Sequence, residues 1–434
     1  MDELENPTWV ERGRVNEQQL MMELLRQQNL TCHNGRFYGI NGAVSDDKVR
    51  QQIYKLLRRH YTSGIKEKVE SILWALRLEL EGDDVHNEPY LIHLLNGTFN
   101  IHTWEFSEYK YICENRLPVR FDPGYTMPSN WMRFVDELLE PEDQITLQQY
   151  LGYCLIPSND AQKMLILLGD GGEGKSRIGV AMSLILGNAM INGSMDKVEH
   201  DRFARANLEG KLLMVDDDLN LEALRTTHHI KSIITADTMM DLERKGQQSY
   251  QGWLNCRFLC FGNGALRALH DRSHGFYRRQ IVLTCKSKDP NRVDDPYLAD
   301  KFLEEVDAIF MWCLMGLCTL HGNNMKFFCS EKAEKAMRHA ILEDNNLIGF
   351  MASEGYFHLG PERMDSTRDL YTAYFRWCSD NALKPYSMKI FSGYLTEHQV
   401  ELGIRYSNNI PLPDGRKVRG FTGISSTLTC NQSP

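Results

Sequence analysis

The sequence contains no C-x-x-C pair, although it has eleven cysteines. Only Cys256 with Cys260, and Cys313 with Cys318, lie near each other along the chain. Zinc sites and disulfide frameworks are built on closely spaced cysteines, so this scatter argues against both. We therefore expect reduced thiols and a cytoplasmic protein.

A membrane-spanning run is also missing. The most apolar stretch, Ala308–Leu320, is shorter than the ~20 residues that cross a bilayer, and it follows the charged segment Lys301–Asp307. It predicts a core helix instead. The N-terminal stretch MDELENPTWVERGR is acidic and polar, which argues against a secretory signal. No membrane partner is expected.

The chain has no excess of positive charge, since its formal net charge is −9. This balance argues against broad coating of nucleic acid, but it does not exclude a protein that grips DNA in a narrow channel. With 434 residues and an apolar content of 42%, the sequence is typical of a soluble globular protein of two or three domains.

The most informative stretch that is present runs from Met164 to Leu186. An apolar run, Met164–Leu168, leads into GDGGEGKS, which fits the pattern G-x-x-x-x-G-K-S/T. The glycines allow successive N–H groups to converge on phosphate oxygens, and the helix that follows adds its positive end. A chance match in a glycine-rich surface loop is the alternative. The predicted cofactors are ATP and Mg²⁺, and the predicted binding residues are Gly169, Asp170, Gly171, Gly172, Glu173, Gly174, Lys175, Ser176 and Arg177, with Ser176 as a metal ligand.

Short apolar runs through the middle of the chain predict buried parallel strands. Helical or loop segments separate them, so we expect a βαβ-type sheet with helices on both faces. After Asp294-Asp295-Pro296, a long helix over Tyr297–Leu320 is expected to close this domain. The four predicted strands are Met164–Leu168, Leu212–Val215, Phe258–Phe261 and Gln280–Thr284.

Polar residues follow these strands where ligands bind in open α/β sheets. Asp216-Asp217-Asp218 can hold Mg²⁺ and polarise an attacking water, although such a triplet is also common in a solvated turn. Asn263 can orient that water, or it can be part of a plain Asn-Gly turn with Gly264. Arg278 and Arg279 can reach the nucleotide of a neighbouring subunit, or they can form a surface basic pair.

The order of these motifs resembles the superfamily 3 helicases of the phage and plasmid primase-helicase type, over about residues 90–425. Gly210 through Asp218 resembles the second motif of that family. Asn263 through Arg279, with Asp271, Ser273 and Gly275 between them, is similar to the third motif and the arginine region. Asn96-Gly97 and the segment from Tyr150 to Met164 resemble the entry to the motor domain. Thr235 through Gly246 matches the hairpin that lines the pore of the ring.

The resemblance implies an AAA+ type P-loop core and an ATP-dependent DNA helicase that forms a ring, with a homo-hexamer expected. Its DNA partners would be single-stranded and forked DNA, along which it would move from 3′ to 5′. Its protein partner would be a replication initiator or primase, and it would act in a bacterial host cell. Lys245 takes the position of the DNA-contacting lysine, with Arg244 beside it; a solvated turn is the alternative. Asp216 departs from the family pattern, and we assign the acidic pair to Asp217 and Asp218, with Asp217 as a metal ligand. No primase activity is expected.

We divide the chain into a helical N-terminal region (1–90), an α+β region before the motor (91–145), the motor (146–325) and a C-terminal winged-helix-like domain (326–434). Helices are expected over Asn16–Gln28 and Val49–Tyr61, and two more within Trp131–Ile156. Tyr90–Leu95 and Thr98–Ile101 predict a hairpin. Glu354–Asp365 is expected to be loop-rich.

The C-terminal region predicts a winged helix. One helix carries Leu370 to Cys378, and a second carries Ile390 to Leu395; Ile404–Tyr406 and Val418–Phe421 then flank the turn Pro413-Asp414-Gly415. Basic residues outnumber acidic ones here, which leaves a rival function open, namely a nucleotide-switched origin-binding or recruitment protein without unwinding activity. An ATPase that remodels protein is a third possibility.

Overall fold

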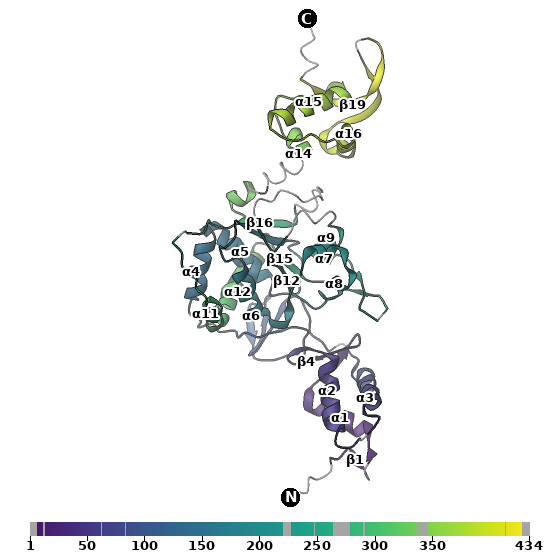
Figure 1. Cartoon of the computed structure of the whole chain (residues 1–434), viewed down its shortest axis with the longest axis vertical. Coiled ribbons are helices and arrows are strands. Elements are labelled where there is room, and N and C mark those ends of the chain that lie inside the picture. The colour runs from purple at the N-terminus through teal and green to yellow at the C-terminus, as the bar shows by residue number, and fades with distance from the viewer. Residues whose placement is uncertain are drawn as a thin grey trace. The chain divides into compact units, whose positions relative to one another are not determined.

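The computed structural model forms two compact units (Figure 1). The first contains the described residues up to 263 and from 278 to 333, and the second contains those from 334 onward. The structure describes residues 7–11, 14–61, 63–82, 84–219, 227–246, 248–263, 278–289, 291–335, 337, 346–412 and 414–427.

The N-terminal part of the first unit combines helices with short strands. Helix α1 follows Asn16, whose side chain accepts the N–H of Gln19, and α2 follows Ser45, which accepts the N–H of Lys48. The two predicted helices are confirmed, but the strands β3, β4 and β5 form a sheet that we did not predict, because these strands include polar or glycine residues and none is a continuous apolar run. The elements are β1 (Val10–Glu11), β2 (Arg14–Val15), α1 (Glu17–Gln28), β3 (Thr31–His33), β4 (Arg36–Gly39), β5 (Gly42–Val44), α2 (Asp46–Leu57) and α3 (Ile65–Leu80).

A four-stranded sheet of order β8-β7-β6-β9 precedes the central parallel sheet in the chain. The predicted hairpin is confirmed as β6 paired with β7, and the predicted pair of helices is confirmed as α4 and α5. The elements are β6 (Leu91–Leu94), β7 (Gly97–Asn100), β8 (Glu105–Ser107), β9 (Arg116–Leu117), α4 (Ser129–Leu138) and α5 (Pro141–Tyr153).

The centre of the first unit is a five-stranded sheet of order β11-β12-β15-β10-β16, in which every pairing is parallel. The four predicted strands are confirmed, and the edge strand β11 is additional. Met164 to Leu168 in β10 are all buried, as expected for a strand covered on both faces. The strands are β10 (Met164–Gly169), β11 (Met190–Asn192), β12 (Leu213–Asp216), β15 (Arg257–Asn263) and β16 (Gln280–Thr284).

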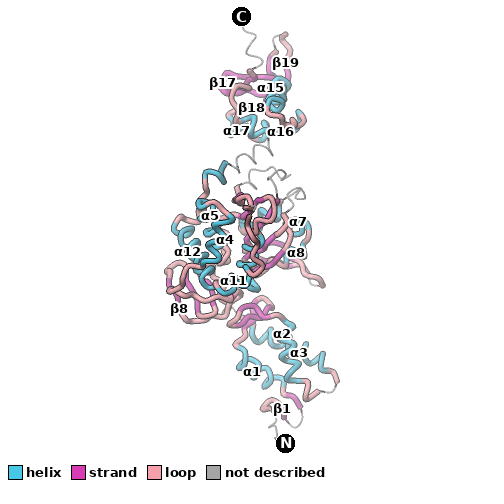
Figure 2. The backbone as a smooth tube through the Cα atoms, turned by 60° about the vertical axis from the view of Figure 1, so that its left-hand side comes forward, coloured by secondary structure: helices cyan, strands magenta, loops and turns pink. Residues whose placement is uncertain are grey.

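Helices flank this sheet on two sides (Figures 1 and 2): α4, α5, α11 and α12 lie on one side, and α7, α8 and α9 on the other. Helices α5 and α12 pack at very close range. A Cβ atom on Gly316 would lie 2.1 Å from the carbonyl oxygen of Gln148, so only glycine permits this approach. The helices are α6 (Ser176–Leu186), α7 (Met195–His200), α8 (Arg202–Ala206), α9 (His228–Thr235), α11 (Leu298–Glu304) and α12 (Val306–Gly322).

The expectation of one long helix over Tyr297–Leu320 was wrong, because the chain forms α11 and α12 with a break at Glu305. The Glu305 carboxylate accepts the backbone N–H groups of Asn130 and Trp131, at 3.1 and 3.2 Å. These N–H groups belong to the first turn of α4 and have no partner within that helix. A tertiary contact therefore accompanies the break, and it could not be read from local sequence. The apolar stretch within α12 is buried, as predicted.

The second unit contains a three-stranded antiparallel sheet of order β17-β19-β18 beside its helices (Figure 2). The predicted helices and the predicted hairpin are confirmed as α15, α16 and the β18–β19 pair. The loop expected over Glu354–Asp365 was wrong, because β17 occupies most of it; Gly360-Pro361 and a register shift between Leu359 and Met364 interrupt its alternation. The elements are α14 (Asn346–Met351), β17 (Phe357–Ser366), α15 (Thr367–Asp380), α16 (Met388–Glu397), α17 (Gln399–Leu402), β18 (Arg405–Pro411) and β19 (Lys417–Ser426).

The ten cysteines within the described ranges are all free thiols. Over the same ranges, no group of three or more His, Cys, Asp or Glu side chains is arranged to hold a metal ion. No described helix combines the length and the apolar character needed to cross a bilayer.

Candidate functional site

The glycine-rich segment joins the carboxyl end of β10 to α6, as the motif predicts. Gly171, Gly172 and Gly174 have φ angles of +109°, +84° and +98°, which residues with a side chain rarely adopt. A Cβ atom on Gly169 would lie 2.8 Å from the Lys175 Nζ atom. The backbone therefore needs glycine at these three positions, whereas a side chain at Gly169 would require the ends of Glu173 and Lys175 to shift.

The Glu173 side chain lies inside this turn rather than in solvent. Only 3% of it is exposed, and its Oε1 atom accepts the backbone N–H groups of Asp170 and Gly171, the latter at 2.9 Å. Its Oε2 atom accepts a hydrogen bond from Lys175 Nζ, also at 2.9 Å. Burial by itself would raise the pKa of Glu173, but these donors outweigh it, so its pKa lies below the ordinary value.

Asn263 lies directly beside this turn. It is the last residue of β15 and pairs in register with Gly169 of β10. Its Oδ1 atom is 3.3 Å from Lys175 Nζ, so two predicted site residues that are far apart in the chain are brought together. Ser176 is exposed at the first position of α6, and Arg177 follows it.

The three aspartates after Val215 differ in their surroundings. Asp216 is buried, and its carboxylate accepts the N–H of Met195 at 2.7 Å and of Asp218 at 3.3 Å. Its burial raises its pKa. Asp217 and Asp218 are exposed just beyond the carboxyl end of β12. Asp216 therefore ties β12 to the start of α7, while the next two carboxylates point to solvent.

Arg278 and Arg279 lie at the opposite end of the sheet from the glycine-rich turn. The carbonyl oxygen of Arg279 accepts the N–H of Met164, the first residue of β10. A strand that rises about 3.3 Å per residue puts this point roughly 16 Å from Gly169. Neither arginine is therefore near the Lys175 of its own chain. Gly264, Asp271, Ser273 and Gly275 lie outside the described residues.

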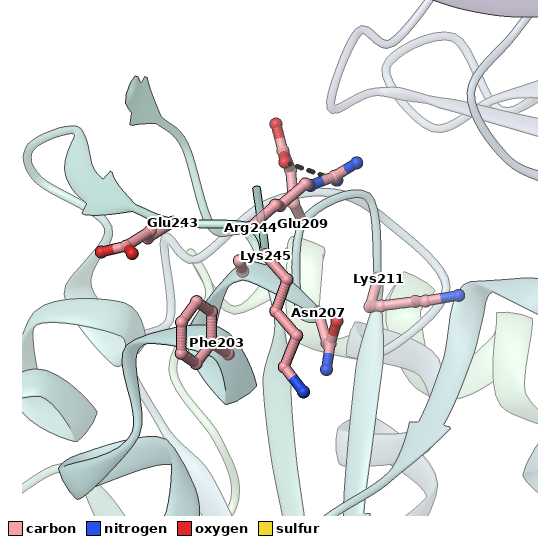
Figure 3. Close-up of a pocket in the computed structure, with 8 residues that line it drawn as sticks. Phe203, Asn207, Glu209, Lys211, Glu243, Arg244 and Lys245 are labelled. Atoms are coloured by element: carbon pink, nitrogen blue, oxygen red, sulfur yellow. Dashed lines mark hydrogen bonds and ion pairs between the residues drawn. The ribbon is translucent and has the colours of Figure 1, made fainter. Parts of the chain in front are cut away.

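The pair Arg244 and Lys245 lies in the turn of a small hairpin, between β13 (Met240–Leu242) and β14 (Tyr250–Gly252). Arg244 Nη2 donates to Glu209 Oε2 at 3.0 Å. Lys245 is exposed at a pocket of about 520 Å³ that Phe203, Asn207 and Lys211 also line. Figure 3 shows Lys245 extending into this pocket beside Asn207, while Arg244 turns toward Glu209.

The sequence did not predict the contacts that join three residues near the β13–β14 hairpin, namely Glu209, Tyr250 and Arg36. Glu209 and Arg36 are 173 positions apart in the chain. No motif connects residues at such a separation, so only the tertiary structure could have found them.

Two families match parts of the chain. Residues 3–140 match a family described as D5 N terminal like, and residues 167–279 match a family of unknown function, DUF5906. Both are domains of the kind found in phage and plasmid primase-helicase proteins. The first match includes the N-terminal region that our resemblance did not cover, and the second spans the glycine-rich segment, the acidic triplet, Asn263 and both arginines.

Solved structures with a similar fold come from NrS-1. The "apo structure of NrS-1 C terminal region (305-718)" has a TM-score of 0.57 and 12% identity, covering 95% of this chain and 100% of that one. An "A form apo structure" of the same region has a TM-score of 0.54 and 12% identity, covering 93% and 98%. At this low identity, the structural likeness shows a similar fold and nothing more. Comparison with curated proteins gives no match.

Proposed function

We propose that this protein is an ATP-driven DNA helicase of a phage or mobile-element replication system. It would work as a ring, with a hexamer expected, and would move along single-stranded DNA. The observation that carries the proposal is the arrangement around Lys175. A motif typical of phosphate-binding loops, a strand-end asparagine and exposed carboxylates come together at one edge of a parallel sheet.

The glycine-rich turn fits a triphosphate because it already binds an anion. The Glu173 carboxylate takes two backbone N–H groups and the Lys175 ammonium, which are the donors that such a motif offers to phosphate oxygens. The carboxylate oxygens thus stand in for phosphate oxygens. A bound nucleotide would be held by residues 169–177, and Mg²⁺ by Ser176 and Asp217. The metal would neutralise the charge that develops on the phosphates.

The remaining residues of the site receive roles by their positions. Asn263 is within hydrogen-bond range of Lys175 and would orient the attacking water. Asp217 and Asp218 would polarise it, and Asp216, already engaged by two backbone N–H groups, would hold the strand end in place. This assignment favours the second and third aspartates as the acting pair.

In an assembly, a neighbouring subunit would supply the arginine that each nucleotide site lacks. Because Arg278 and Arg279 lie at the far end of β10 from Gly169, they would act only on the nucleotide of a neighbour. An arginine inserted in this way typically contributes ~10³–10⁵ in rate. The strand order, with β10 between β15 and β16, also supports an AAA+ type motor.

A second candidate function has its own support in the second unit. Helices α15 and α16 followed by the β18–β19 hairpin are the kinds of element that make up a winged helix. Arg405, Lys417 and Arg419 are exposed on the two strands of this hairpin. A protein that bound duplex DNA through this hairpin and recruited others, without unwinding, would use the same nucleotide site as a switch.

One experiment tests the motor. We expect ATP hydrolysis by the purified chain to increase severalfold with single-stranded DNA, and the mass in solution with nucleotide to correspond to a ring. A hydrolysis rate that does not change with DNA would favour a protein-remodelling ATPase. A monomer with full activity would refute a nucleotide site shared between two subunits. Displacement of a strand from a forked duplex separates the motor from the recruitment protein.

A further inference from the structure

Glu209 is the common partner of three donors around the hairpin. It lies in the turn between α8 and β12, and its Oε2 atom accepts hydrogen bonds from Arg244 at 3.0 Å, from the Tyr250 hydroxyl and from the Arg36 guanidinium. Arg244 belongs to the hairpin turn, Tyr250 begins β14, and Arg36 begins β4 in the N-terminal region. One carboxylate therefore joins three segments that are distant in the chain.

The charges at this point are partly shielded from water. The Glu209 side chain is 18% exposed and that of Arg36 is 28% exposed. Burial by itself would lower the pKa of Arg36, but the attraction of Glu209 outweighs it and the pKa is raised. Burial and the hydrogen bond to Glu209 raise the pKa of Tyr250 to about 12. Such interactions are stronger than those of fully exposed ion pairs.

The hairpin needs anchors of this kind. Strands β13 and β14 pair over only three positions, and an isolated two-stranded ribbon is marginally stable in water. Glu243 contacts Arg202 of α8 at 2.8 Å, and Arg244 contacts Glu209, so the two residues before Lys245 are both held by neighbouring elements. Figure 3 shows the result, with Arg244 drawn to Glu209 and Lys245 extending into the pocket.

We propose that Glu209 is a positioning residue for the DNA hairpin, and that Arg244 acts through it instead of contacting the strand. Lys245 alone would then meet the DNA phosphates. Because Arg36 shares the carboxylate, the hairpin and the N-terminal strand β4 have a common anchor. This inference rests on the proposed function, since it assigns a role in DNA binding.

The test measures the binding of a labelled oligo(dT) strand by fluorescence anisotropy at several salt concentrations. We expect Glu209→Gln to weaken binding by about three- to tenfold, because it releases the hairpin, while the salt slope stays unchanged. Arg36→Ala should also weaken binding, but by a smaller factor than Glu209→Gln does. Basal ATP hydrolysis should be unchanged, and more DNA should be needed for half-maximal stimulation.

The opposite result has a distinct signature. If Arg244 contacts the strand directly, freeing it by Glu209→Gln would tighten binding and steepen the salt slope by about one unit. That outcome, or unchanged binding, would overturn the proposal. In an Arg244→Ala background, Glu209→Gln should cause a smaller loss than it does in wild type, because only the contacts to Arg36 and Tyr250 then remain to be lost, whereas independent contributions would add in full.

Two further variants keep the result interpretable. Asp241→Asn changes an exposed carboxylate on β13 of the same hairpin, and we expect it to bind DNA as wild type does. Should Glu209→Gln fail to fold, Tyr250→Phe removes one donor to the same oxygen and should also weaken binding; wild-type affinity in that variant would overturn the proposal. If Lys245→Ala has no effect on DNA binding, the proposed function itself fails.

Discussion

The two lysines of the first unit to which we assign functions, Lys175 and Lys245, have opposite surroundings. Lys175 is 7% exposed and its ammonium is already bound by Glu173 and Asn263. Lys245 is exposed, and within the described parts of the chain no hydrogen bond or ion pair reaches its ammonium group. A charge removed from water must be neutralised by the protein, whereas a charge left in water needs no partner. The charge of Lys175 is therefore already neutralised within the protein, whereas that of Lys245 remains in contact with water.

The largest expected effect follows from removing the buried lysine. Lys175→Ala should lower ATP hydrolysis by about 10²- to 10³-fold or more, because the main positive charge beside the phosphates is lost. The fold should survive with reduced stability, since Glu173 keeps its two backbone donors but loses its charged partner. Turnover measured with saturating ATP checks this, with Lys326→Ala, an exposed lysine of the same unit, as the control. Ordinary turnover by Lys175→Ala would refute the nucleotide site.

Removing the exposed lysine should separate DNA handling from nucleotide binding. Lys245→Ala should bind ATP as wild type does, but it should lose strand displacement and reduce the salt slope of DNA binding by about one unit. A forked-duplex assay gives the first readout. Lys417→Ala, on the hairpin of the second unit, is the matched comparison. If Lys417→Ala abolishes DNA binding and Lys245→Ala does not, the recruitment function is favoured.

A variant with a smaller expected effect tests whether the Glu173 carboxylate occupies the position of a phosphate group. Glu173→Gln removes the charge that a triphosphate must displace, so we expect nucleotide affinity to rise by about three- to tenfold. Without nucleotide the variant should be less stable than wild type, because Lys175 loses its charged partner. Isothermal titration and thermal melting with and without ATP measure both effects. Glu105→Gln, at an exposed position on β8, is the control.

The same variant also has an expected pH dependence. The pKa of Glu173 is lowered in the folded protein, so its contribution to stability is present above the unfolded value and is lost as the pH falls through the lowered one. We expect Glu173→Gln to lose stability less steeply in acid. An equally steep acid limb would contradict the lowered pKa of Glu173. Nucleotide affinity below that of wild type would show that the carboxylate does not compete with phosphate.

Local pattern was enough to predict the strands that frame the proposed nucleotide site. Continuous apolar runs identified β10, β12, β15 and β16, and a shared strand direction brings the residues that follow them to one edge of the sheet. The strands β3, β4 and β5 were missed because they contain polar or glycine residues and no continuous apolar run, and β17 was missed because Gly-Pro interrupts its pattern.

The sequence by itself determined where the glycine-rich turn forms, because the backbone angles at Gly171, Gly172 and Gly174 depend on having no side chain there. It could not decide which charges meet. That Glu173 turns inward onto Lys175, that Arg244 binds Glu209 while Lys245 stays open, and that Arg36 joins them depends on distances between segments far apart in the chain. Only tertiary packing sets those distances and the exposure to water that makes a charge bound or free.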